Sequence, residues 1–178
     1  MPKLSIVLLL DDKTDRFVIG LSRRLSRRSD TMFTLDGRRF YPHITLSGVR
    51  VTRVRTAVMK RDVARIASRC APFRVSLSDF SESRRYFGWN CVRDARLSGL
   101  RKRAVSYMAG LDGVLLSKPV YRPHVTITRF RRRSDVKKGF EVIRSKKAGF
   151  IARYIALCRN SHHGTVTKII AKFRLEVG

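Results

Sequence analysis

Cysteine is scarce in this sequence. The three thiols, Cys70, Cys91 and Cys158, lie far apart, and no two of them form a C-x-x-C pair. This spacing excludes a disulfide framework and gives no support for a zinc site. We therefore predict a reducing compartment, the cytoplasm, and no bound metal ion.

Long apolar runs are also missing. The most apolar stretch, residues 4–10, is shorter than a transmembrane helix, and Asp11 and Asp12 follow it where a signal peptide would have a small-residue cleavage site. We expect no membrane association. Because nearly every position of 4–10 is apolar, the stretch is typical of a central strand that is covered on both faces.

Linkers rich in Pro, Gly or Ser are absent, and so are low-complexity segments. A chain of 178 residues, of which 43% are hydrophobic, is long enough to bury a core. We predict that residues 1–178 form one domain of two small lobes and that the protein is a monomer.

Acidic residues are few as well. Lys and Arg number 40 against 13 Asp and Glu, which gives a formal net charge of +27 and a pI near 11.5. Such a charge implies a polyanionic partner. Roughly three quarters of the basic residues are Arg, whose planar guanidinium holds phosphate through two hydrogen bonds and stacks on bases, so RNA is favoured over a membrane. The alternative is a basic solvated surface like that of a ribosomal protein.

The sequence does contain a regular alternation of helical and strand patterns. Apolar residues recur at helical spacing from Phe17 to Leu25, from Met59 to Cys70 and from Leu97 to Leu111, and a short basic helix is expected over 134–147. Asp12 or Thr14 would cap the first helix, and Asp94 the third. Strand patterns cover 31–35, 39–47, 49–54, 73–78, 86–92, 121–129, 149–158 and 165–177. The turn Asp36-Gly37 predicts a β-hairpin that joins strands 31–35 and 39–47. The order of helices and strands along the whole chain predicts an α+β fold.

Two of these strands carry the same motif, Pro-His-apolar-Thr-apolar. It occurs as Pro42-His43-Ile44-Thr45-Leu46 and again, 81 positions later, as Pro123-His124-Val125-Thr126-Ile127. In each strand the His and the Thr point to one face of the sheet and the apolar residues to the other. A third His-x-Thr triplet, His163-Gly164-Thr165, lacks the Pro and the apolar residues, so we interpret it as an accident or a minor phosphate contact. The repeat predicts one site built from two matching strands.

The residue types of the motif suit displacement at phosphorus. Such a reaction needs a base to activate the incoming oxygen and an acid to protonate the leaving one, and His43 and His124 can supply both, because imidazole titrates near ~6.5. The hydroxyls of Thr45 and Thr126 would donate to the non-bridging phosphate oxygens. No metal ion or cofactor is required. The alternative is that these are ordinary strand histidines and threonines without a catalytic role.

The paired motifs resemble the 2H phosphoesterase superfamily, most of all its bacterial 2′-5′ RNA ligase or RNA 2′,3′-cyclic phosphodiesterase branch. The likeness includes the apolar first strand, the Leu35-Asp36-Gly37 turn, and Ser161 with Gly164 before the last strand. It implies two pseudo-symmetric lobes of mainly antiparallel strands around a central cleft, with helices outside. It also implies that His43 donates a proton and His124 accepts one, with the two threonines on the phosphate.

Three further residues are candidates for binding the substrate. Arg129 follows the second motif closely enough to reach the phosphate. Tyr41 and Tyr121 each precede a motif and, like Trp89, can stack on a base, although aromatic residues in such positions more often belong to a core. Relatives often carry an aromatic residue near the start of the last strand, where this sequence has His162 and His163, so base stacking from that side is not expected.

The sequence as a whole therefore predicts a metal-independent phosphodiesterase acting on RNA or nucleotides that end in a 2′,3′-cyclic phosphate. Two alternatives stay open. A 2′-5′ RNA ligase of the same family would run the same in-line chemistry with an RNA hydroxyl in place of water. A non-catalytic basic RNA-binding protein would need only the charge.

Overall fold

Nine strands form one antiparallel sheet in the computed structural model, which describes residues 3–51, 56–83, 85–111, 114–117, 121–142 and 148–176. The strands are β1 (Lys3–Leu9), β2 (His43–Val51), β3 (Phe73–Ser83), β4 (Tyr86–Cys91), β5 (Val114–Ser117), β6 (His124–Arg129), β7 (Ala148–Ala152), β8 (Tyr154–Asn160) and β9 (Val166–Arg174). The helices are α1 (Asp12–Arg28), α2 (Thr56–Ala67), α3 (Ala95–Ala109), the 3-10 turn η1 (Arg133–Val136) and α4 (Lys137–Val142). The order along the sheet is β7-β3-β4-β6-β2-β1-β8-β9, with β5 paired to β2 outside this path. The α+β class is confirmed.

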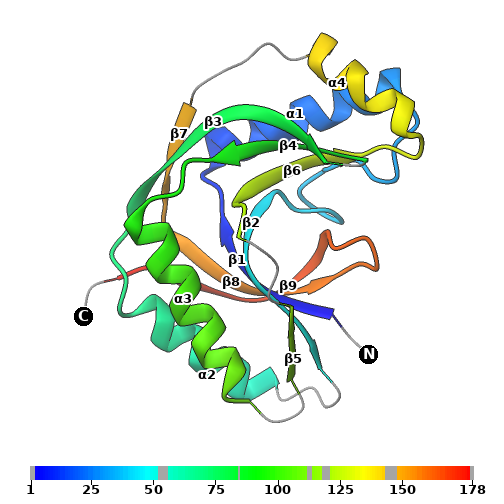
Figure 1. The fold of residues 1–178 in the computed structure, drawn as a ribbon. Helices are drawn as coiled ribbons and strands as arrows, with labels where there is room; N and C mark the ends of the chain where they lie inside the picture. Colours follow the sequence, from blue (N-terminus) through cyan, green and yellow to red (C-terminus); the bar gives the residue numbers. More distant parts are fainter. Residues whose placement is uncertain are drawn as a thin grey trace.

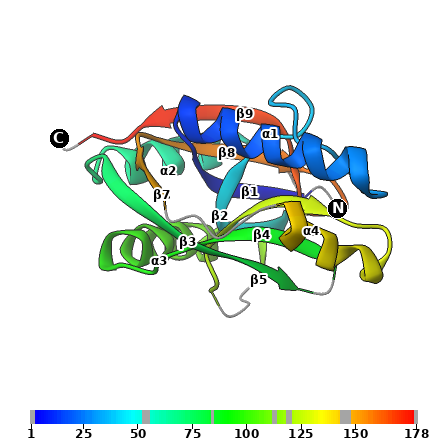
Figure 2. The same cartoon turned by 90° about the horizontal axis from the view of Figure 1, so that it is seen from above.

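The sheet has two halves that meet where β2 lies beside β6 (Figure 1). One register pair, Ile44 opposite Val125, joins these two strands. Helices α2 and α3 pack on β8 and β2 in one half, whereas α1 packs on β6 in the other. Seen from above, β8 and β9 lie on one side of the molecule and β3 and β4 on the other (Figure 2). The two motif strands therefore lie at the junction of two halves, each backed by helices.

Strand β1 is central in its half, between β2 and β8. Leu4, Ile6 and Leu8 are buried in the main core, while Val7 points to the opposite face and belongs to a smaller apolar cluster with Ala156. Burial on both faces confirms the central strand that the apolar run predicts.

Helix α1 begins one residue earlier than predicted. Asp11 is its N-cap, because the Asp11 carboxylate accepts a hydrogen bond from the backbone N–H of Thr14 at 2.8 Å. The prediction of Asp12 or Thr14 as the cap was wrong. Helix α3 is capped by Asp94 as predicted, through the N–H of Leu97 at 2.7 Å.

The predicted hairpin does not form, because the first of its arms is not a strand. The carboxylate of Asp36 instead accepts three backbone N–H groups, those of residues 38, 39 and 40, and the N–H of Leu35 donates to the Ser22 hydroxyl of α1. Side chains thus satisfy part of this backbone, and the Met32 N–H donates to the carbonyl of Arg129 at 2.7 Å beside an isolated bridge from Thr31 to Phe130. The predicted strand 49–54 is the continuation of β2 as far as Val51, and its remaining residues lie outside the described ranges.

The predicted strand 149–158 is two strands that belong to different halves. β7 pairs with β3, and β8 pairs with β1, with Arg153 between them. The segment therefore crosses from one half to the other. The predicted helix 134–147 is present as η1 and α4 as far as Val142, and its last five residues lie outside the described ranges. Strand β5 is not among the strands predicted from the sequence. No helix within the described ranges is long and apolar enough to span a membrane.

Candidate active site

The two motifs lie side by side and face each other across one strand pair. β2 and β6 are antiparallel with Ile44 opposite Val125, so the residue before Ile44 lies opposite the residue after Val125. His43 is thereby placed across from Thr126, and His124 across from Thr45. Because both apolar partners point into the core, the two histidines and two threonines share the other face of the sheet, called the motif face below.

Both imidazole rings are held in the same way. The Nδ1 of His43 is 2.7 Å from the carbonyl oxygen of Tyr41, and the Nδ1 of His124 is 2.8 Å from that of Arg122. A carbonyl oxygen only accepts hydrogen bonds, so Nδ1 carries the hydrogen in each ring. The free nitrogen is therefore Nε2 in both, and in a neutral ring it is a proton acceptor.

The two rings differ in their surroundings. His43 is 7% exposed, whereas His124 is an exposed residue. Burial lowers the pKa of His43 to about 4; the hydrogen bond with Tyr41 acts in the opposite direction, and the nearby His124 lowers the pKa further. His43 is thus neutral at pH 7 in the free protein.

Each motif strand carries a β-bulge immediately after its threonine. In β2, Thr45 and Ser47 pair with consecutive residues of β1, which leaves Leu46 as the extra residue. In β6, Thr126 and Thr128 pair with consecutive residues of β4, so Ile127 is the extra residue. The two halves therefore share the backbone irregularity as well as the motif.

The bulge in β6 decides which side chain follows Thr126 on the motif face. Regular alternation would place Thr128 there, but Thr128 is buried and donates to the carbonyl of Phe33 at 3.3 Å. The extra residue reverses the alternation, so Arg129 shares the motif face with its register partner Tyr86.

Arg129 is held by the third His-x-Thr triplet. Its guanidinium lies 4.7 Å from the centre of the Tyr86 ring, and its Nη1 donates to Nδ1 of His163 at 3.3 Å. The Tyr86 hydroxyl donates to the carbonyl of His163 at 3.1 Å. Burial and the charges of His162 and Arg129 lower the pKa of His163, which favours the neutral, accepting ring. Sequence reasoning missed this contact, because only the sheet brings residues 129 and 163 together.

Gly88 is a further site residue that the sequence did not reveal. It pairs with Thr126 on β4. A Cβ atom on Gly88 would lie 3.2 Å from the carbonyl oxygen of Val125 and 3.4 Å from Cδ2 of His124. The absence of a side chain therefore gives the His124 ring room to lie against β4.

The three aromatic residues considered for base stacking lie in different surroundings. Tyr41 lies beside the motif face, next to the apolar cluster of Val7 and Ala156. Tyr121 instead packs against the main core, with the guanidinium of Arg101 4.4 Å from the centre of its ring. Trp89 is 1% exposed, so it belongs to the core and cannot stack on a base.

A hollow of about 480 Å³ adjoins His43. Its lining includes Tyr41 and Pro42, which precede His43, and Leu9, its register partner. The rest of the lining is Leu10, Asp11, Asp12, Asp15, Gly37, Ile151, Arg153, Tyr154, Ile169 and Lys172.

Acidic side chains gather at this hollow. Burial raises the pKa of Asp15 to about 6, and the neighbouring carboxylates of Asp12 and Asp11 add to the shift. Within the described ranges, no three His, Cys, Asp or Glu side chains are grouped so that they could hold a metal ion.

Comparisons with known proteins agree with the resemblance of the motifs. Residues 22–164 match the model of the 2′-5′ RNA ligase superfamily. No curated protein sequence is a significant match.

Among solved structures, E. coli LigT complexed with NADP+ superposes with a TM-score of 0.63 at 17% identity, over 98% of this chain and 99% of that one. TT0787 of Thermus thermophilus gives 0.61 at 18% identity over 98% of both chains. The PDE domain of MHV ns2 gives 0.60 at 12% identity, over 90% of this chain and 100% of that one. The structural likeness shows the fold, and the family match extends over most of the sequence: the chain belongs to the 2′-5′ RNA ligase superfamily, the 2H phosphoesterases.

Proposed function

We propose that this protein is a phosphodiesterase that opens the 2′,3′-cyclic phosphate at the end of an RNA. The observation that carries the proposal is the reciprocal pairing of the motifs. Each histidine lies across from the threonine of the other motif. In each ring the Nδ1–H donates a hydrogen bond to a backbone carbonyl, so Nε2 is the nitrogen that is free for proton transfer. Two proton-transfer groups beside two hydroxyl donors suit in-line displacement at phosphorus.

In the proposed reaction a water molecule attacks the phosphorus atom. One imidazole accepts a proton from the water at Nε2 while the P–O3′ bond breaks, and the other imidazolium gives its Nε2 proton to the leaving 3′ oxygen. The products are a 2′-phosphate and a 3′-hydroxyl. The next turnover requires the two rings to exchange their protons with solvent.

The threonine hydroxyls and Arg129 would hold the phosphate. Thr45 and Thr126 can donate to the non-bridging oxygens, and the fixed guanidinium of Arg129 adds positive charge where negative charge develops. The hollow beside Tyr41 offers space for the adjoining nucleoside. Structures of E. coli LigT complexed with 3′-AMP, ATP and NADP+ are consistent with nucleotide binding by this fold.

The two histidines differ in which proton state they favour. His43 is the neutral ring of the free site, because burial lowers its pKa to about 4, and this favours His43 as the base and His124 as the acid in hydrolysis. The family resemblance implies the opposite roles. A bound phosphate would raise the pKa of both rings through its negative charge. We assign the base to His43, and a substrate with an altered leaving group tests that choice.

The test of the function is turnover without metal. Purified protein is incubated with an RNA ending in a 2′,3′-cyclic phosphate in the presence of a chelator, and the 2′-phosphate product is measured. We expect turnover that is abolished in His43→Ala and in His124→Ala. His162→Ala, which removes an exposed imidazole that contacts the His163 ring but lies outside the two motifs, should not abolish turnover. Absence of turnover in the parent, or turnover only with added divalent metal, contradicts the proposal.

The family description favours one second function, the joining of RNA ends through a 2′-5′ bond. In that reaction an RNA hydroxyl replaces water as the attacking group, and the same residues take the same roles. Adding an RNA with a free 5′-hydroxyl to the assay distinguishes the two reactions, because a ligase would yield the joined product in place of the 2′-phosphate. If the protein does neither but still binds RNA, it is a non-catalytic RNA-binding protein.

A further inference from the structure

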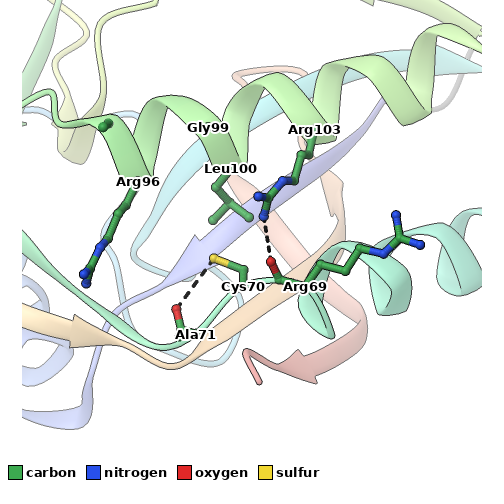
Figure 3. Close-up of a pocket in the computed structure, with 8 residues that line it drawn as sticks. Arg69, Cys70, Ala71, Arg96, Gly99, Leu100 and Arg103 are labelled. Carbon is green, nitrogen blue, oxygen red and sulfur yellow. Dashed lines mark hydrogen bonds between the residues drawn. The ribbon is translucent and has the colours of Figure 1, made fainter. Parts of the chain in front are cut away.

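A second hollow lies on the helical side of the sheet, away from the motif face. It opens between the segment that follows α2 and the first turns of α3, and its volume is about 410 Å³ (Figure 3). Its lining consists of Arg69, Cys70, Ala71, Ala95, Arg96, Gly99, Leu100 and Arg103. The two histidines cannot reach it, because α3 packs on the core face of β2 whereas His43 points to the other face.

Three arginines surround this hollow without an acidic partner. Arg96 and Arg103 project from α3 toward the segment after α2, with the Cys70 thiol between them (Figure 3). Within the described ranges, neither they nor Arg69 is in a salt bridge, although four such bridges occur elsewhere. Arg103 is held in place, since its Nη1 donates to the carbonyl of Arg69 at 2.7 Å. Unneutralised guanidiniums around a hollow are a feature of phosphate sites.

The surrounding face is also basic. The two helices that border the hollow also carry exposed cations, namely Lys60, Arg61 and Arg65 on α2 and Lys102 on α3. Three acidic residues lie in this region: Asp62 is 6% exposed, Asp94 caps α3, and Glu176, whose N–H donates to the carbonyl of Ala67, forms a salt bridge with Arg174. A polyanion that entered the hollow would therefore meet further positive charge on leaving it.

The floor of the hollow is apolar. The exposed side chains of Ala71 and Ala95 and the backbone at Gly99 form it, and Leu100, which is 1% exposed, lies beneath them. The volume lies within the range of about 300–1,000 Å³ that is usual for small-ligand sites. An apolar floor with a guanidinium rim suits a nucleotide, since the base can lie on the floor and the phosphate at the rim.

Gly99 keeps the hollow open. A glycine inside a helix costs roughly 0.8–1 kcal/mol relative to alanine, so a packing reason is usually found for it. Here there is none, because a Cβ atom on Gly99 would meet nothing within 4 Å. A larger side chain at this position would instead extend into the hollow that Gly99 lines.

We propose that this hollow binds one nucleotide of an RNA strand, with the phosphates on either side of that nucleotide at the separate guanidiniums of the rim and the base against the apolar lining. The substrate role rests on the proposed function, because the RNA held there would carry the cyclic phosphate at its end. Binding itself does not depend on catalysis. A cyclic mononucleotide cannot occupy this hollow and the motif face together, so the site acts only on longer RNA.

The first test fills the hollow without removing charge. Gly99→Leu is compared with Gly20→Leu, since Gly20 is also inside a helix with open space at its Cβ position. Affinity for a single-stranded RNA with an ordinary 3′-hydroxyl end is measured by fluorescence anisotropy, and circular dichroism checks that both variants are folded. We expect Gly99→Leu to lose about tenfold in affinity and Gly20→Leu to match the parent. Equal affinities overturn the proposal.

The second test removes charge in matched pairs. Arg69→Gln with Arg96→Gln is compared with Arg23→Gln and Arg27→Gln on the exposed face of α1. Both double variants lose the same charge, so a difference between them reports a site and not the overall field. The first pair should bind RNA more weakly than the second and reduce the salt slope of log affinity by about 0.7 per lost phosphate contact. Equal losses in the two pairs contradict a site at the hollow.

Cys70 gives a direct readout of occupancy. It is the most accessible of the three thiols, because Cys91 and Cys158 are buried. Alkylation of Cys70, followed by mass spectrometry, should slow severalfold when RNA is added, and inorganic phosphate alone should protect much less. Protection by phosphate equal to that by RNA would mean a small-anion site and overturn the nucleotide proposal. If turnover fails while these RNA effects are present, the proposed function is wrong and the RNA site stands. If turnover is present and only the RNA effects fail, the RNA site is wrong and the proposed function stands.

Discussion

The two motif strands agree in backbone and differ in surroundings. Each histidine gives its Nδ1 hydrogen to the carbonyl two residues earlier, and each threonine is followed by a bulge. Yet His43 is buried, and the preceding Tyr41 and Pro42 line a hollow, whereas His124 is exposed beside Gly88. Five residues after each histidine, one strand has Gly48 and the other Arg129.

This comparison separates what the repeat supplies from what the fold supplies. The repeated sequence orients two equal rings, because the same local hydrogen bond selects the same free nitrogen in each. Burial then makes the rings unequal, and an unequal pair is what acid–base chemistry requires. Arg129, which is held near the motif of β6 where β2 has Gly48, gives the phosphate a preferred side.

The largest expected effect is the loss of hydrolysis when either histidine is replaced, and the choice of leaving group distinguishes the acid from the base. His124→Ala removes the proposed acid and should slow hydrolysis of the cyclic phosphate by about 10²–10⁴. The same substrate with sulfur in place of the leaving 3′ oxygen needs little protonation, so it should restore most of the rate to His124→Ala. His43→Ala should be slow with both substrates, because the base is still missing. Single-turnover rates on the two substrates measure this, and restoration of His43→Ala alone would assign the roles in the opposite way.

Arg129→Ala should give the next largest effect. Removing one preorganised donor to developing negative charge costs about 10²–10³ in kcat, and the bulge brings Arg129 to the motif face that Thr126 shares. His163→Ala should cost less, because it leaves the guanidinium in place and removes only the contact at 3.3 Å that orients it. Arg131→Ala is the matched control, since Arg131 is exposed and paired with Asp30. If Arg131→Ala lowers kcat as much as Arg129→Ala does, the net positive charge of the protein and not the position of Arg129 determines the rate.

The buried histidine also makes a prediction about stability against pH. The pKa of His43 is lowered to about 4 in the folded protein from 6.5, so the unfolded chain binds the extra proton first. The free energy of unfolding should therefore fall as the pH decreases from about 6.5 to 4, by roughly 3 kcal/mol at most. In His43→Asn this part of the decrease should disappear, as measured by urea unfolding across that range. His124→Asn is the exposed control, and an unchanged pH dependence in His43→Asn would show that His43 is not the group responsible.

Much of this site could be predicted from the sequence, because its chemistry is local. His43, Thr45, His124 and Thr126 occur in a repeated pattern whose period of two fixes a common face. The central strand and the cap of α3 are local for the same reason. The structure adds that the two motif strands are neighbours, through the pair of Ile44 with Val125. This long-range pairing could not be predicted from either motif alone.

The errors occurred where distant residues or single side chains decide the structure. The arm 31–35 looks like a strand, but it forms an isolated bridge from Thr31 to Phe130, and its Leu35 N–H donates to the Ser22 hydroxyl. The segment 149–158 looks like one strand, although its two parts pair in different halves. The contact of Arg129 with His163 has no sequence signal, because a bulge and a loop must both form before it exists.

The smallest expected effect compares two glycines of the motif face. Gly88→Ala adds a methyl group 3.2 Å from the carbonyl of Val125 and 3.4 Å from the His124 ring, whereas Gly48→Ala adds one to open space in the other half. Because proton transfer depends on small displacements, Gly88→Ala should lower kcat up to about tenfold with little change in KM, and Gly48→Ala should change neither much. Steady-state kinetics on a cyclic mononucleotide measures both variants. Equal values of kcat would mean that the His124 ring adapts to the added methyl group, so that its hydrogen bond to Arg122, and not the space above Gly88, determines its position.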